Sequence, residues 1–212
     1  PGGFSFGDYL RCGAIAALSP ILGNIKEFAL EGGLLLGICN GFQVLVKSGL
    51  LPGNRDLIQE VSLIINDSAK FEDRWVYLKG WQPATRSLQS KSRCVWTRGL
   101  PDIIYLPVAH GEGKFITPDK KTLERLKRNA QIVFQYCDEQ GRLRGYPYNP
   151  NGSVNNIAGI CDETGRILGI MPHPERHMDF FQHPHWQSIK KPRQPDGLLI
   201  FKNGVEYAKR YL

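Results

Sequence analysis

A cysteine lies between two glycines where the sequence changes from apolar to helical character. The segment Gly37-Ile38-Cys39-Asn40-Gly41 ends the apolar run 34–38 and leads into a predicted helix. A nucleophile on a strand-to-helix turn has a strained backbone, and the flanking glycines let neighbouring segments approach closely. The helix start favours a thiolate and supplies N–H donors for an oxyanion. The spacing predicts that Cys39 is a nucleophile, although a lone cysteine is more often a buried small residue.

His173 is the base that this nucleophile requires. In Met171-Pro172-His173-Pro174-Glu175, two prolines restrict the backbone around the histidine, which follows an apolar strand. Open α/β sheets place their ligands at strand ends. Glu175 is near enough in sequence to bind the second imidazole nitrogen and stabilise the imidazolium. His173 alone is compatible with a surface loop, so the predicted triad of Cys39, His173 and Glu175 depends on both segments together.

The other histidines give weaker signals. His110 also follows an apolar strand, and two interpretations are open for it: a residue lining the pocket or a structural residue. His177, His183 and His185 lie close together in sequence, but no acidic or cysteine side chain has ligand spacing to them. We therefore expect no metal site in this chain.

The elements that must position these residues are indicated by apolar periodicity and turn formers. Strands rich in β-branched and aromatic residues, separated by helical patterns, indicate an α/β fold with a mostly parallel central sheet. Helices are expected at 20–30, 40–48, 121–129 and 197–211, and strands at 34–38, 61–65, 75–78, 103–108 and 132–136. Segments 157–161 and 167–171 flank a glycine-containing turn and predict a hairpin. Residues 182–195 are rich in proline and polar residues, which indicates a surface loop.

Composition limits the class of protein. With 212 residues and 42% hydrophobic content, the chain is expected to be a single domain over residues 1–212. The net charge of +7 favours an acidic partner, but the basic residues are dispersed without interleaved aromatics, so we expect no nucleic-acid binding. The five cysteines are widely spaced, which predicts no disulfide framework and favours a reducing, cytoplasmic location. No apolar run is long enough for a membrane span.

Five stretches resemble the triad-type (class I) glutamine amidotransferases. Within that family they are most similar to the glutaminase subunits of phosphoribosylformylglycinamidine synthase, an enzyme of purine biosynthesis. Two motifs are more specific for these subunits than the triad is: Cys-Asn-Gly followed by Phe-Gln, and the long opening motif. The matching stretches are Pro1 to Gly13 (PGGFSFGDYLRCG), Gly37 to Gln43 (GICNGFQ), Pro107 to Gly113 (PVAHGEG), Asn151 to Ser153 (NGS) and Met171 to Arg176 (MPHPER).

The resemblance implies a flavodoxin-like amidotransferase fold and a glutaminase mechanism. Cys39 would form a γ-glutamyl thioester and release ammonia, with His173 as base and Glu175 orienting it. The matched positions imply that the backbone N–H groups of Gly3 and Asn40 form the oxyanion hole and that Gln43 helps to bind glutamine. The ammonia would pass to a separate synthetase subunit, assisted by a small third subunit. That synthetase would bind ATP and magnesium and convert formylglycinamide ribonucleotide to its amidine; this chain would need no cofactor.

This sequence differs from the family at one point, and three alternative functions stay open. Family members carry a strand, a helix and a second strand before the opening motif, so we expect a first βαβ segment to be missing from this sequence. The alternatives are the glutaminase subunit of another amidotransferase, a γ-glutamyl hydrolase or cysteine peptidase on the same scaffold, and a non-catalytic interaction subunit. The Cys-Asn-Gly and opening motifs count against the peptidase, and the complete triad counts against the non-catalytic subunit.

Overall fold

A six-stranded sheet forms the centre of the molecule. This computed structural model describes residues 1, 3, 13–54, 56–80, 93–190 and 194–212. In spatial order the strands are β1 (Leu35–Ile38), β8 (Ile167–Ile170), β7 (Ile157–Cys161), β6 (Ile132–Cys137), β3 (Glu72–Gly80) and β4 (Ile103–His110). A separate two-stranded sheet joins β2 (Ser62–Ile64) to β5 (Lys114–Ile116). β6, β7 and β8 are buried along their whole length, as expected for strands covered on both faces.

The pairing of the strands confirms the α/β class and corrects one detail. β1 pairs parallel with β8, whereas the other four pairings in the sheet are antiparallel. The described part of the sheet is therefore mixed and not mostly parallel. The physical reason is visible between β7 and β8, where the short turn allows a hairpin but is too short for the crossover that parallel neighbours need. That hairpin is the one predicted from the sequence.

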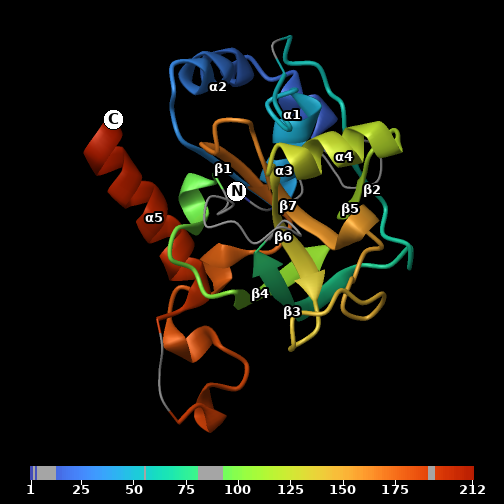
Figure 1. Cartoon of the computed structure of the whole chain (residues 1–212), viewed down its shortest axis with the longest axis vertical. Helices are drawn as coiled ribbons and strands as arrows, with labels where there is room; N and C mark the ends of the chain where they lie inside the picture. Colours follow the sequence, from blue (N-terminus) through green and yellow to red (C-terminus); the bar gives the residue numbers. More distant parts are fainter. Residues whose placement is uncertain (2, 4–12, 55, 81–92, 191–193) are drawn as a thin grey trace.

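The described residues also form five α-helices. They are α1 (Ala14–Ala17), α2 (Ile21–Leu30), α3 (Asn40–Lys47), α4 (Lys120–Arg128) and α5 (Asp196–Tyr211). Figure 1 shows α2, α3 and α4 in the upper part of the molecule, and α5 in red along another side. The four predicted helices are confirmed to within one or two residues, while α1 and β5 were not predicted.

Five short 3₁₀ segments complete the described structure. They are η1 (Val95–Thr97), η2 (Val154–Asn156), η3 (Pro174–Arg176), η4 (Phe180–Gln182) and η5 (Trp186–Ser188). The predicted loop 182–195 contains η5, and its residues 191–193 lie outside the described part of the chain. Most of the opening motif, including Gly2 and Cys12, also lies outside it.

Close packing of α3 against the sheet fixes the start of that helix. Phe42 is fully buried over β8, where a Cβ atom added to Gly169 would lie only 2.0 Å from its ring. Phe42 also stacks on Phe115 of β5, with ring centroids 6.3 Å apart. Because buried aromatic rings tolerate little displacement, the first turn of α3 is held over the end of β8.

Cys39, Cys94, Cys137 and Cys161 are buried thiols that form no disulfide with one another. Among the helices that the structure describes, none combines the length and apolar character needed to cross a membrane.

Candidate active site

Cys39 occupies the sharp turn that the sequence predicted. Its φ and ψ are 51° and −107°, a conformation that non-glycine residues rarely adopt, and its N–H donates to the carbonyl of Ile170 at 2.8 Å. A Cβ atom on Gly37 would lie 2.8 Å from the carbonyl group of Gly41, so strand and helix approach as closely as the two glycines permit. The structure therefore confirms a strained strand-to-helix turn with Cys39 at its apex.

His173 leaves the neighbouring strand at the same end of the sheet. Because β1 and β8 are parallel and in register, Cys39 and the segment after Ile170 emerge side by side. The N–H of His173 donates to the carbonyl of Pro107 in β4 at 2.8 Å. The residues that follow pack on the first turn of α5, where a Cβ atom added to Gly197 would lie 1.9 Å from the carbonyl oxygen of Pro174. The loop that carries the histidine is thus held by contacts with both β4 and α5.

Glu175 contacts the His173 ring directly. Nδ1 of His173 and Oε1 of Glu175 are 2.6 Å apart. Burial acts to raise the pKa of Glu175, but the hydrogen bond and charge interaction with His173 outweigh it and hold the pKa below its ordinary value. An ionised Glu175 fixes the proton of the ring on Nδ1 and leaves Nε2 as the reactive nitrogen.

The third member of the predicted triad, Cys39, also interacts with His173. Burial alone would lower the pKa of His173, but its interactions with Cys39 and Glu175 raise it to about 9. Nε2 is buried and has no hydrogen-bond partner among the described residues within ordinary hydrogen-bond geometry. The Cys39 thiol itself donates a long hydrogen bond to the Ala109 carbonyl at 3.7 Å. Cys39, His173 and Glu175 are therefore brought together, with the thiol and the imidazole poised for proton exchange.

The residues predicted to bind substrate surround the same turn. Nδ2 of Asn40 donates to Oε1 of Gln43 at 2.9 Å, and Nε2 of Gln43 donates to the Glu112 carbonyl at 2.7 Å. The Gln43 carboxamide is thereby fixed in one orientation. Gly3 is exposed, and Pro1, two residues before it, accepts a hydrogen bond from the N–H of Gly41 at 3.1 Å. The roles of Gly3, Asn40 and Gln43 in binding glutamine or an oxyanion stay predictions.

His110 lies beside this site, because the carbonyl of the preceding residue, Ala109, accepts the hydrogen bond from the Cys39 thiol. His110 is 2% exposed; burial, reinforced by the positive charge of His173, lowers its pKa to about 4, so the ring is neutral at physiological pH. Tyr136 is fully buried and interacts with Cys39; burial raises its pKa well above the ordinary value, so its hydroxyl keeps the proton. Sequence reasoning did not identify Tyr136, because a tyrosine in a buried strand is indistinguishable by pattern from a core residue.

The remaining histidines form an aromatic cluster. His177 and His183 pack on Trp75 and Tyr105, with ring centroids 5.2 to 5.8 Å apart across the cluster. Nδ1 of His177 is 3.1 Å from the Tyr105 carbonyl oxygen. Among the described residues, no group of three or more histidine, cysteine or acidic side chains is arranged to hold a metal ion.

Comparison with known proteins agrees with this arrangement. A family model described as a CobB/CobQ-like glutamine amidotransferase domain matches residues 1–208. The chain belongs to this family. Membership of this amidotransferase family confirms the resemblance drawn from the motifs. It also connects the strained cysteine and the histidine–glutamate pair with the chemistry of one class of enzyme.

Individual members of the family are similar over nearly the whole chain. The phosphoribosylformylglycinamidine synthase subunit PurQ of Archaeoglobus fulgidus is 45% identical over 99% of this chain and 77% of its own length. The subunit of the same name from Dehalococcoides mccartyi is 43% identical, covering 99% and 78%. Among solved structures, that of PurLQS from Thermotoga maritima is 31% identical with a TM-score of 0.71, covering 98% of this chain and 77% of the other.

Proposed function

We propose that this chain is the glutaminase subunit of a phosphoribosylformylglycinamidine synthase. The observation that carries the proposal is the meeting of Cys39, His173 and Glu175 at the ends of two parallel strands, in a family of glutamine amidotransferases. Relatives that carry the name of this subunit supply the choice of acceptor enzyme. Residues 1–212 act as one amidotransferase domain.

The reaction follows from the positions of the three side chains. His173 Nε2 takes the thiol proton of Cys39 and holds it as an imidazolium, in keeping with its raised pKa, and the thiolate attacks the side-chain amide carbon of glutamine. His173 then returns the proton to the amide nitrogen, which leaves as ammonia, and a γ-glutamyl thioester remains. Water, deprotonated by the same imidazole, attacks the thioester and releases glutamate. Glu175 holds the ring and stabilises its positive charge in both steps.

The surrounding groups bind the substrate and stabilise charge. The backbone N–H groups of Gly3 and Asn40 donate to the oxyanion of the tetrahedral intermediates, and Gln43 contacts the amino-acid end of glutamine. The ammonia passes to a synthetase subunit, with a small accessory subunit in the complex. ATP and magnesium bind to that synthetase, which converts formylglycinamide ribonucleotide to its amidine. The chain itself binds no cofactor and works in the cytoplasm.

Replacing Cys39 tests the proposal. In the complex with the synthetase, Cys39→Ala is expected to abolish glutamine-dependent amidination, while amidination with added ammonium is retained because the synthetase site is intact. Both activities are measured as formation of formylglycinamidine ribonucleotide. Loss of the ammonium-dependent activity as well would contradict a subunit that only supplies ammonia.

A chemical probe gives an independent test. A glutamine-mimicking diazo-ketone should modify Cys39 of the wild-type complex, and mass spectrometry of the digested chain locates the adduct. Failure to modify Cys39 in the presence of the synthetase would overturn the glutaminase assignment.

A further inference from the structure

The turn from His110 to Gly113, between β4 and β5, lies against the reactive cysteine. The carbonyl of Ala109, at its start, accepts the hydrogen bond from the Cys39 thiol at 3.7 Å. The carbonyl of Glu112, inside it, accepts the hydrogen bond from Gln43 at 2.7 Å. The turn and the residue before it therefore contact both the carboxamide of Gln43 and the nucleophile.

Asn66 binds this turn at three points. Its Nδ2 donates to the His110 carbonyl at 2.8 Å, and its Oδ1 accepts from the N–H of Gly113 at 3.0 Å. Its own N–H donates to the Gly111 carbonyl at 3.0 Å. Asn66 is 1% exposed, and one residue thus satisfies polar groups at both ends of the turn.

Asn151 binds the same turn from the opposite side. Its Nδ2 donates to the Gly113 carbonyl at 2.8 Å and to the Tyr136 hydroxyl at 3.3 Å, and lies 3.5 Å from Nε2 of His110. Its Oδ1 accepts from the N–H and the hydroxyl of Ser153, at 3.0 and 2.7 Å. The side chain is fully buried, with both ends of the carboxamide occupied.

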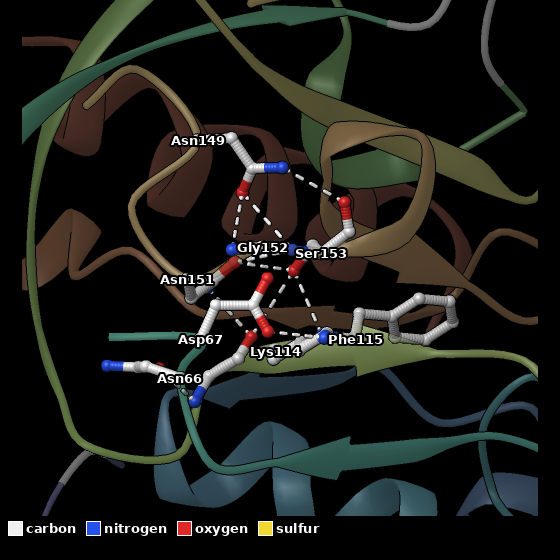
Figure 2. A network of polar contacts seen from close by, with 9 residues as sticks. Asn66, Asp67, Lys114, Phe115, Asn149, Asn151, Gly152 and Ser153 are labelled. Carbon is white, nitrogen blue, oxygen red and sulfur yellow. Dashed lines mark hydrogen bonds and ion pairs between the residues drawn. The ribbon is translucent and has the colours of Figure 1, made fainter. Parts of the chain in front are cut away.

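The loops that carry the two asparagines are tied to each other. Figure 2 shows Asn66 and Asp67 below the 149–153 loop, with Lys114 and Phe115 beside Asp67. The N–H of Asp67 donates to the Asn151 carbonyl at 3.2 Å, and Lys114 pairs with the Asp67 carboxylate.

Gly152 makes this contact possible. Its φ is +79°, and a Cβ atom at that position would lie 1.9 Å from the Asp67 carboxylate oxygen. Asn66 and Asn151 therefore act on the turn as one connected unit.

The hydrogen bonds leave the turn little conformational freedom. The carbonyls of His110, Gly111, Glu112 and Gly113 are all occupied, by Asn66, Gln43 and Asn151. A change in backbone conformation there would leave buried carbonyls unpaired, which is costly. Such rigidity is what a substrate-binding turn needs, since small displacements of positioning groups reduce rates strongly.

We propose that Asn66 and Asn151 are positioning residues for glutamine binding: together they fix the 110–113 turn, and through it Gln43. The inference rests on the proposed glutaminase function and on Gln43 as a substrate contact. Neither asparagine reacts; each acts through the backbone of the turn. Because both hold the same turn, their effects on substrate binding must overlap.

The test separates binding of glutamine from reactivity of the cysteine. Asn66→Ala, Asn151→Ala and the double variant are assembled with the synthetase. Each single variant is expected to raise the KM for glutamine by roughly tenfold with a smaller fall in kcat, and to slow diazo-ketone modification of Cys39 by a similar factor. Modification by iodoacetamide, which needs only the thiol, should stay within about twofold of wild type. The increase in the KM for glutamine in the double variant should be well below the product of the increases in the two single variants.

Asn203→Ala is the matched control. Asn203 likewise donates two carboxamide hydrogen bonds to backbone carbonyls, of Trp96 and Arg98, but away from the turn. Its loss should lower the melting temperature without changing the KM. If Asn151→Ala fails to fold, Asn151→Asp, which keeps the volume and the acceptor for Ser153, carries the same measurement.

The outcomes distinguish this inference from the proposed function. An unreactive wild-type Cys39 would overturn both. A reactive wild type with folded variants of unchanged KM and unchanged diazo-ketone rate would overturn only the positioning role. Equal slowing by both reagents would also overturn it, because general damage to the site and not lost glutamine binding would be the cause.

Discussion

The His173–Glu175 pair connects the chemistry of this chain to its stability. The pKa of His173 in the folded chain, about 9, lies above its ordinary value of 6.5, so protonated His173 stabilises the fold fully below about pH 6.5. That contribution is lost as the pH rises through about 9. The pKa of Glu175 is depressed, so its contribution is present above its ordinary value of 4.5 and is lost as the pH falls through the folded-state pKa.

Glu175→Gln should reveal this pH window. The variant is expected to be less stable than wild type by about 1 kcal/mol near neutral pH, a figure reduced from the full shift because the Glu175 side chain is 40% exposed. The difference should shrink above pH 9 as His173 loses its proton. Urea denaturation between pH 6 and 10 measures it, with Glu206→Gln on the exposed side of α5 as control. A difference that is constant across this range would contradict the assignment.

At the scale of the element, the packing of β1 against α3 depends more on Gly37 than on Gly41. A Cβ atom on Gly37 would lie 2.8 Å from backbone atoms of Gly41 and 2.5 Å from the Leu45 side chain, whereas one on Gly41 would approach the Pro1 carbonyl at 3.3 Å. Gly37→Ala is therefore expected to cost about 1–3 kcal/mol of unfolding free energy and to slow alkylation of Cys39, and Gly41→Ala to cost less. Chemical denaturation and iodoacetamide labelling measure the two effects.

Gly23 in the middle of α2 provides the contrast for this comparison. A Cβ atom there meets nothing within 4 Å, so Gly23→Ala should stabilise the chain by about 0.5–1 kcal/mol through helix propensity. Equal losses from Gly37→Ala and Gly41→Ala would show that the close approach of strand and helix is not what limits substitution.

Local apolar patterns in the sequence identified the helices and strands. They carried no information about the contacts that hold the 110–113 turn. β1, α3 and α5 follow periodic apolar patterns, and the residues of each pattern are close neighbours. β5 is only three residues long, which is too short for a pattern to stand out.

Cys39, His173 and Glu175 could be predicted because each has a distinctive neighbourhood of glycine or proline. Asn66 and Asn151 meet the Gly113 backbone from 47 and 38 residues away, and an asparagine in a polar loop carries no signal of such a contact. The antiparallel order of the sheet was missed for a related reason, since strand partners are chosen by long-range packing.

At the scale of the whole molecule, the excess of basic residues bears on assembly. A net charge of +7 without a nucleic-acid-binding pattern favours docking to an acidic surface of the synthetase. The association of the two subunits should therefore weaken as sodium chloride is raised from about 50 to about 500 mM, mainly through a slower on-rate. Surface plasmon resonance measures it, and an affinity independent of salt would contradict an electrostatic contribution.

The parallel pairing of β1 and β8 also makes the reactivity of Cys39 a measure of correct folding. The nucleophile and the base leave adjacent strands whose register is Gly37 to Gly169 and Ile38 to Ile170. A slip of one residue would turn every side chain of one strand to the opposite face of the sheet and separate the thiol from the imidazole. Misfolded chains with slipped strands would keep their secondary structure and lose reactivity. Labelling of Cys39 by a glutamine analogue is thus a quality test for refolded or mutated protein, because it counts only molecules in which these two strands have found their native alignment.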